Sequence, residues 1–330
     1  MSGHLLLLYR DAHDLGEQLA AARPPAGHRV VVACRPENRD VVFAGRDTVH
    51  IERPDIHTRP AAALALYRRL ARPPDAGPMT IVAEPRPGTT GRDWIRAARC
   101  EAACDLAGPG DHADLICAYP ENTPEPLLKN LINTHPELLT RYGRQLNPDH
   151  AEPVSVLREL TPCRPGPEPL HAPVLEMTGF STITELGAVR REIAAHLAGL
   201  PTLVRTDFVA AVNELVTNGH LHGAPPLGLR MWVTGDRVEC RVTDHGPGVP
   251  DPVAGYRPNP GSRRSGAGLW LARQLCDDID MWRAGRVFTV RAATAVSAER
   301  NRQHFGAVAR AETARTRAGL AAERTHQRRS

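Results

Sequence analysis

The sequence predicts an α/β protein with two domains. Over residues 1–146, short apolar runs alternate with amphipathic segments of helical period, a pattern that favours a parallel sheet covered by helices on both faces. Residues 147–173 are rich in proline, which favours a semi-rigid linker. Residues 174–296 resume the alternation with helical segments followed by strands. We therefore expect a doubly wound parallel-sheet domain, a linker and a second α/β domain.

The elements of the first domain follow from this alternation. Asp11 precedes an amphipathic run and is placed to cap a helix. The predicted strands are Leu5–Tyr9, Val30–Ala33, Thr48–Ile51, Met79–Ala83 and Leu115–Ala118, and the predicted helices are Asp11–Ala22, Pro60–Leu70, Asp93–Leu106 and Glu125–Asn133.

The carboxyl ends of parallel strands are where such sheets bind ligands. By analogy with that rule, the candidates in this domain are Tyr9, Arg10, Glu84, Glu101 and Tyr119. A phosphate loop ending in G-K-[ST] follows none of the predicted strands, so we do not expect ATP to bind in this domain.

Composition excludes several classes of protein. No stretch approaches the roughly 20 apolar residues of a membrane span, and Leu5–Leu8 is too short for a secretory signal, so a cytoplasmic protein is expected. The seven cysteines are scattered, which indicates neither a disulfide framework nor a zinc site. The net charge is +4, and nearly all cations are arginine; we attribute this to base composition and do not expect nucleic-acid binding.

The chemistry of the second domain begins with a helix predicted over Thr202–His222. Glu214 and Asn218 are four residues apart, so a carboxylate and a carboxamide share one face of that helix. An amide oxygen suits a Mg²⁺ ion that keeps most of its waters, and a carboxylate can act as a base. Alone, this spacing is more typical of an ordinary exposed helix.

Two glycine-bearing segments follow. A strand predicted over Arg237–Thr243 ends at Asp244, and Gly246 and Gly248 come next, so the carboxylate could accept a hydrogen bond from an adenine amino group. The loop 251–265 has the composition of a mobile lid. Gly266 and Gly268 then open an apolar helix, whose free amides could hold phosphate. Each segment alone also fits a plain turn or helix cap, and Arg263 and Arg264 fit a solvated surface as well as a phosphate contact.

The order of these segments carries a family resemblance. Residues 174–294 resemble the GHKL-type ATPase domain, and Glu214-Leu-Val-Thr-Asn218 through His222-Gly223 is similar to the N box of the RsbW-like anti-sigma-factor serine kinases. Asp244-His-Gly246-Pro-Gly248 is similar to the first glycine box, and Gly266-Ala-Gly268-Leu269-Trp-Leu to the second. Gly219 departs from the alanine usual in the N box, which weakens the helix by up to about 1 kcal/mol.

The resemblance implies a two-layer α/β sandwich over residues 174–296 that binds ATP and Mg²⁺. It implies that Asn218 holds Mg²⁺, that Glu214 acts as the catalytic base, and that Asp244 reads adenine with Thr289 in support. The nucleotide-site residues that it implies are Asn218, His222, Asp244, Gly246, Gly248, Arg264, Gly266, Gly268, Leu269 and Thr289.

A second resemblance covers the first domain. The segments that carry it are His4 with Tyr9-Arg10-Asp11, Ala83-Glu84-Pro85, Arg99-Cys100-Glu101-Ala102, Cys117-Ala118-Tyr119 and Thr134-His135-Pro136. Residues 1–146 thereby resemble the MEDS sensory domain, which is found fused to such ATPase domains in RsbA-like anti-sigma regulators of actinobacteria. The resemblance does not identify the signal that is sensed.

Together the resemblances imply a regulator that binds a sigma factor and phosphorylates a serine or threonine of a STAS-type anti-anti-sigma partner. One alternative is an ATP-dependent sigma-factor switch without phosphoryl transfer. Another is a sensor histidine kinase, which the missing helical hairpin before the ATPase domain disfavours. Residues 297–330 are expected to be a disordered basic tail, and a homodimer remains an open option.

Overall fold

The computed structural model describes residues 3–24, 27–43, 48–51, 59–71, 77–109, 112–161, 166–180, 182–249, 251, 254–256 and 267–296. The chain divides into two compact units. The first comprises Met1–Pro162 with Val249–Pro260, and the second comprises Cys163–Gly248 with Gly261–Ser330.

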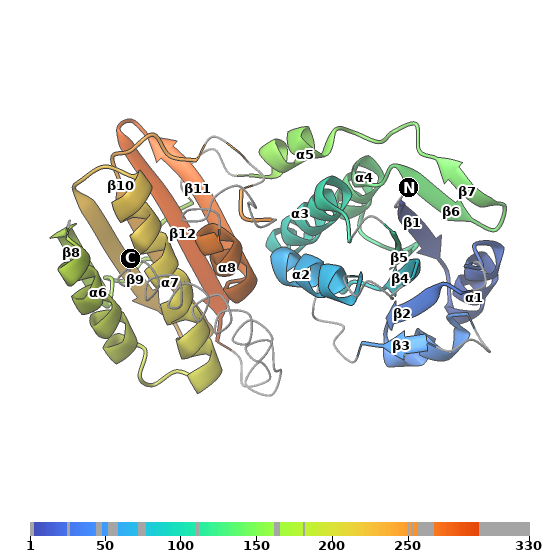
Figure 1. Ribbon diagram of the computed structural model, residues 1–330, viewed down its shortest axis with the longest axis horizontal. Helices are drawn as coiled ribbons and strands as arrows, with labels where there is room; N and C mark the ends of the chain where they lie inside the picture. Colours follow the sequence, from blue (N-terminus) through green and yellow to red (C-terminus); the bar gives the residue numbers. More distant parts are fainter. Residues whose placement is uncertain are drawn as a thin grey trace, which may run out of the picture. The chain divides into compact units, whose positions relative to one another are not determined.

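The first unit contains a largely parallel sheet (Figure 1). Its strands are β1 (His4–Tyr9), β2 (Arg29–Ala33), β3 (Thr48–His50), β4 (Met79–Ala83), β5 (Ala113–Pro120), β6 (Glu137–Thr140) and β7 (Gly143–Leu146), in the spatial order β3-β2-β4-β5-β1-β6-β7. Its helices are α1 (Ala12–Ala21), the 3-10 helix η1 (Pro36–Val41), α2 (Pro60–Ala71), α3 (Gly91–Ala107), α4 (Glu125–Thr134) and α5 (Pro153–Leu160). In this spatial order, all neighbouring strands from β3 at one edge to β6 are paired in parallel, and β7 at the other edge is antiparallel to β6.

Alternation along the strands assigns the helices to the two faces. Leu5 and Leu7 of β1 share a core with Leu15 and Leu19 of α1, so α1 covers one face. His4 points the other way, because alternate residues of a strand face opposite sides, and it contacts Glu101 of α3. Helices therefore cover both faces of the sheet, which confirms the predicted parallel-sheet architecture.

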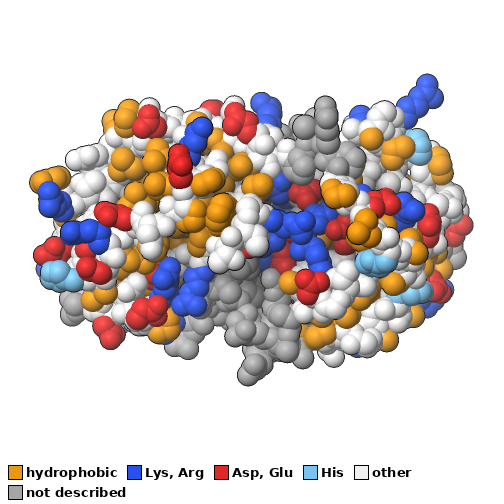
Figure 2. Space-filling view, turned by 180° about the vertical axis from the view of Figure 1, so that it is seen from behind, with side chains coloured by type: hydrophobic (Ala, Val, Ile, Leu, Met, Phe, Trp, Pro, Cys, Tyr) orange, Lys and Arg blue, Asp and Glu red, His pale blue; other side chains and the backbone are white. Residues whose placement is uncertain are grey.

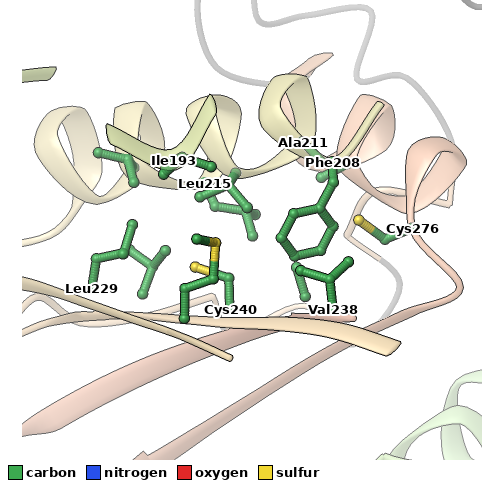
Figure 3. Close-up of a cluster of buried hydrophobic side chains, with 14 of the residues drawn as sticks. Ile193, Phe208, Ala211, Leu215, Leu229, Val238, Cys240 and Cys276 are labelled. Carbon is green, nitrogen blue, oxygen red and sulfur yellow. The ribbon is translucent and has the colours of Figure 1, made fainter. Parts of the chain in front are cut away.

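The second unit is a two-layer structure. Its strands are β8 (Leu175–Phe180), β9 (Leu227–Val233), β10 (Arg237–Asp244), β11 (Asp278–Ala284) and β12 (Val287–Ala295), and its helices are α6 (Ile183–His196), α7 (Thr202–His222) and α8 (Ala267–Leu275). The strands form an antiparallel sheet in the order β11-β12-β10-β9-β8. Between the layers, Phe208 and Leu215 of α7 pack against Val238 and Cys240 of β10 (Figure 3).

Several elements differ from the expectations. A helix was not expected in residues 147–173, but α5 occupies Pro153–Leu160. This helix can form because proline is accepted in the first turn of a helix. The Glu152 side chain also caps it by accepting hydrogen bonds from the amides of Val154 and Ser155. The β6–β7 hairpin, η1 and β11 were also missed. The six cysteines in the described residues are free and buried.

None of the described helices is both long enough and apolar enough to span a bilayer.

On the face of the molecule drawn in Figure 2, Lys and Arg side chains gather beside Asp and Glu side chains. The expected lid, residues 251–265, falls mostly outside the described residues, and the expected tail, residues 297–330, falls wholly outside them.

Candidate nucleotide site

The predicted carboxylate and carboxamide lie on the second half of α7. Glu214 and Asn218 are both half-buried and one helical turn apart. The core face of the same helix is formed by Phe208, Val212 and Leu215. Packing of that apolar stripe against the sheet fixes the rotation of α7 and thereby sets the direction of the polar pair.

Gly268 brings the start of α8 against this pair. A β-carbon placed on Gly268 would lie 3.0 Å from Glu214 Oε2 and 3.1 Å from both Asn218 Nδ2 and Oδ1. These separations are shorter than an ordinary van der Waals contact, so a side chain at this position would displace one of the two polar groups. The structure thus assembles two motifs that are 50 residues apart in the sequence. Leu269, the next residue, packs its side chain against the core.

Asp244 is the buried end of β10 and is held by the loop that follows it. Its Oδ1 accepts a hydrogen bond from the Gly246 amide at 2.7 Å. The His245 amide donates to the Ala224 carbonyl at 2.8 Å. The loop is therefore tied to the residues that follow α7, and Asp244 is oriented before any ligand binds.

Gly223 and Gly246 permit this close approach. A β-carbon on Gly223 would lie 2.6 Å from Asp244 Cγ, and a β-carbon on Gly246 would lie 2.5 Å from Gly223 Cα. Neither distance is compatible with a side chain. The two glycines accordingly let the end of α7 touch the end of β10.

Packing explains why glycine stands at position 219, where the N box usually has alanine. A β-carbon on Gly219 would lie 3.1 Å from Leu227 Cδ2. An alanine here would require Leu227 of β9 to move by a few tenths of an ångström. The helix-weakening glycine therefore lets the first residue of β9 approach α7.

Gly248 turns the chain beside Phe288. Its φ of 77° lies in the left-handed region that favours glycine, and a β-carbon there would lie 2.7 Å from the Phe288 ring. The Arg283 guanidinium donates to the Gly246 carbonyl and lies 5.9 Å from the centre of the same ring. Sequence reasoning missed Phe288 and Arg283, because they lie opposite each other on β12 and β11 through a register that the sequence does not display.

Thr289 lies on the other face of the sheet from Asp244. The register pairs Asp244 with Phe288 and pairs Thr289 with Thr243. Val242 and Cys240 belong to the core beneath the helices, so Asp244 shares the helix-covered face and Thr289 has the opposite orientation. This placement does not bring Thr289 beside Asp244, and we leave it out of the site proposed below.

The remaining predicted residues divide into two groups. His222 is the exposed last residue of α7, next to Gly223. Arg264 and Gly266 fall outside the described residues. The assembled site therefore consists of Glu214, Asn218, Asp244, Gly246 and Gly268, with Gly248 and His222 at its edge.

The candidates of the first unit form two separate buried groups. In one, the Glu84 carboxylate accepts hydrogen bonds from the Tyr9 hydroxyl at 2.5 Å and the Asn38 amide at 2.9 Å. It also pairs with the Arg35 guanidinium at 2.8 Å. Burial, together with the hydrogen bond to Glu84, raises the pKa of Tyr9. This arrangement holds strand ends together, while Arg10 lies outside it and pairs with Asp14.

The other group surrounds Glu101, which lies within α3, as the predicted helix Asp93–Leu106 implies, so its choice as a residue at the carboxyl end of a strand was wrong. Tyr119 donates a hydrogen bond to Glu101 Oε1 at 2.5 Å, and His4 and His135 approach the other carboxylate oxygen. Burial alone would raise the pKa of Glu101, but the hydrogen bond from His4 and the two imidazoles hold it at about 2. Burial lowers the pKa of His135 to about 3.

Comparison with known proteins bears on the second unit. Residues 181–294 match the family model of the histidine kinase-like ATPase domain. A similar solved structure is the crystal structure of the RsbU and RsbW domains of Rv1364c from Mycobacterium tuberculosis, with 21% sequence identity and a TM-score of 0.29. That similarity covers 36% of this chain and 31% of the other, so it spans about a third of that protein. No curated protein matches the chain. The part of this chain from residue 181 to residue 294 is a GHKL-type, histidine kinase-like ATPase domain.

Proposed function

We propose that this protein is an ATP-binding regulator of the anti-sigma kind, with serine/threonine kinase activity toward a STAS-type anti-anti-sigma partner. It would hold a sigma factor when that partner is absent. The first unit, residues 1–146, would act as its sensory domain and the ATPase domain as its output. The RsbW-like N box and the MEDS-like segments in the sequence support this assignment.

The contact of Gly268 with Glu214 and Asn218 carries the proposal. It sets the first turn of α8 next to a carboxylate and a carboxamide that share one face of α7. A helix start favours phosphate because its amides and its dipole face outward. Amides suited to phosphate, a potential ligand for Mg²⁺ and a potential base would thus lie within a few ångströms of one another.

The residues present suit Mg·ATP. Asn218 would hold the ion through its side-chain oxygen, and Asp244, oriented by the Gly246 amide, would accept a hydrogen bond from the adenine amino group. When bound, Mg·ATP supplies the phosphoryl group and offsets its developing charge. Glu214 would take the proton of the partner's hydroxyl, since its carboxylate faces the start of α8.

Titration calorimetry with Mg·ATP tests the nucleotide site. Asn218→Ala should weaken binding at least about 10-fold, because a metal ligand is lost. Asn213→Ala is the matched control: it lies on the same helix five residues earlier, so its side chain points about 140° away. Equal affinity of the Asn218 variant and the native protein would refute the assignment.

Phosphoryl transfer needs its own measurement. With labelled ATP and a candidate STAS protein, the native chain should label the partner, whereas Glu214→Gln should bind ATP and transfer label at least about 100-fold more slowly. A partner that stays unlabelled would identify the chain as a switch that binds ATP without catalysis. Acid-labile phosphate on the chain itself would instead indicate a histidine kinase.

A further inference from the structure

Four potential metal-binding side chains meet inside the first unit, outside the ATPase domain. They are His4 at the start of β1, Glu101 on α3, Cys117 on β5 and His135 directly after α4. Their side chains are at most 5% exposed. One ligand atom from each lies within 4.8 Å of all the others.

The spacing of these atoms fits a tetrahedral ion. Glu101 Oε2 lies 3.2 Å from His4 Nε2, 3.2 Å from Cys117 Sγ and 3.6 Å from His135 Nε2. Cys117 Sγ lies 3.5 Å from His4 Nε2. A tetrahedral Zn²⁺ ion, with bonds of about 2.0 Å to nitrogen or oxygen and about 2.3 Å to sulfur, separates its ligand atoms by about 3.3–3.6 Å. Four of the six separations between ligand atoms are thus close to those around such an ion, and the other two are no longer than 4.8 Å.

The hydrogen bond made by His135 Nδ1 leaves the other ring nitrogen, Nε2, facing the Glu101 carboxylate. Nδ1 lies 2.6 Å from the Leu131 carbonyl, which can only accept, so Nδ1 carries a proton and donates. In the neutral ring Nε2 then carries a lone pair and acts as an acceptor, and it lies 3.6 Å from the Glu101 carboxylate. Among the described residues, none hydrogen-bonds to this nitrogen. A cation between these two acceptors would offset the cost of burying them face to face.

Groups outside the cluster lie behind two of the other ligands, Glu101 and His4. Tyr119 occupies Glu101 Oε1 and leaves Oε2 directed at the cluster. His4 Nδ1 lies 3.9 Å from Asp105 Oδ1, and Asp105 is in turn held by His150 at 2.8 Å. A carboxylate behind a ligating histidine is the usual outer support of a metal site.

We propose that His4, Glu101, Cys117 and His135 bind one Zn²⁺ ion. The charges balance: Cys117 releases its proton on binding, and the thiolate and the carboxylate together neutralise the ion while both imidazoles stay neutral. All four positions come from the protein and the site is buried, so it has the character of a structural zinc site and not of a catalytic one. The ion would join the first strand of the unit to α3, β5 and the end of α4.

Metal analysis of the full chain, prepared without a histidine tag, tests the site. The native protein should contain about one zinc per chain, and Cys117→Ser and His135→Gln should each contain less than about a tenth of that. Cys34→Ser, which changes a buried thiol that donates to the Val82 carbonyl, and His50→Gln, which changes an exposed histidine, are the controls. Both should keep the zinc.

A cobalt experiment keeps the test decisive if the variants misfold. The native chain refolded with Co²⁺ should show the near-ultraviolet thiolate-to-cobalt absorption and the intense visible bands of a tetrahedral ion, and Cys34→Ser should show the same. Absence of zinc in the native protein together with absence of the thiolate absorption would overturn the proposal. Stoichiometric zinc that survives both the Cys117 and His135 substitutions would also overturn it.

Discussion

Replacing Gly246 by alanine should weaken the nucleotide site through a collision with the backbone, while the side chains of Glu214, Asn218 and Asp244 stay unchanged. The new β-carbon would lie 2.5 Å from Gly223 Cα, 2.7 Å from Gly223 C and 3.0 Å from Ala224 N. All three are backbone atoms, so no side-chain rotation relieves the overlap. A normal carbon contact is about 3.5–4.0 Å, so the loop after β10 must move about 1 Å from the end of α7.

The expected cost has two parts. Overpacking of this kind lowers the free energy of unfolding by about 1–3 kcal/mol. The same movement breaks the alignment of Asp244, whose Oδ1 is held by the Gly246 amide. Loss of a hydrogen bond to a charged group is worth about 1.5–3 kcal/mol, so Mg·ATP affinity should fall about 10- to 100-fold.

Urea unfolding and titration calorimetry measure the two parts separately. Gly235→Ala is the matched control, because a β-carbon there meets nothing within 4 Å in the described structure. It should be neutral or stabilise the protein by up to about 1 kcal/mol. If Gly246→Ala kept both native stability and native affinity, the contact between the end of α7 and the loop after β10 would not be what orients Asp244.

Three further changes test other parts of the structure. Phe208→Ala empties the centre of the second unit's core, where the ring is fully buried (Figure 3), and should cost about 3–5 kcal/mol in urea unfolding. Thr182→Ala removes a capping box in which Thr182 and Glu185 satisfy each other's amides, and should cost about 0.5–2 kcal/mol by the same measurement. Tyr119→Phe removes the hydrogen bond to Glu101 Oε1 and should weaken zinc binding about 10- to 100-fold in a competition titration with a chelator.

The local motifs of the ATPase domain were predictable because their geometry is set by helical spacing. Glu214 and Asn218 share a face in any helix, whatever packs around it. The sequence could not show that Gly268 would lie against them, since that contact depends on how α8 meets α7. The family resemblance, and not the spacing, supplied that expectation.

The errors have identifiable physical causes. Thr289 was assigned to the adenine from its strand alone, but the face of a strand residue depends on a register that the sequence does not display. Strand β11 was missed because Asp278 and Asp280 look like loop residues. In the structure their charges are paired with Arg237 at 2.5 Å and Arg291 at 2.7 Å. Pairing across the sheet makes acidic residues compatible with a strand.

The cluster around Glu101 shows the limit of cysteine spacing as a guide to metal sites. The scattered cysteines argued against zinc because short-range ligand pairs were missing. In the fold, His4 lies against Glu101, 97 residues away, and against Cys117, 113 residues away. Pairing of β1 with β5, and the packing of α3 on that face, create this proximity. A site assembled from four elements leaves no local pattern to detect.

The glycines of the ATPase motifs also acquire a different meaning from the structure. The sequence suggested that they let backbone approach a ligand, yet a side chain on Gly223, Gly246 or Gly248 would collide with the protein itself. Their function is then to assemble the site, whereas Asp244 would recognise the nucleotide. The two roles are separable: Asp244→Asn keeps the shape and should reduce ATP affinity with a change in unfolding free energy below about 1 kcal/mol, while Gly246→Ala should reduce both. Equal losses of stability in the two variants would show that Asp244 is itself a structural residue of the loop.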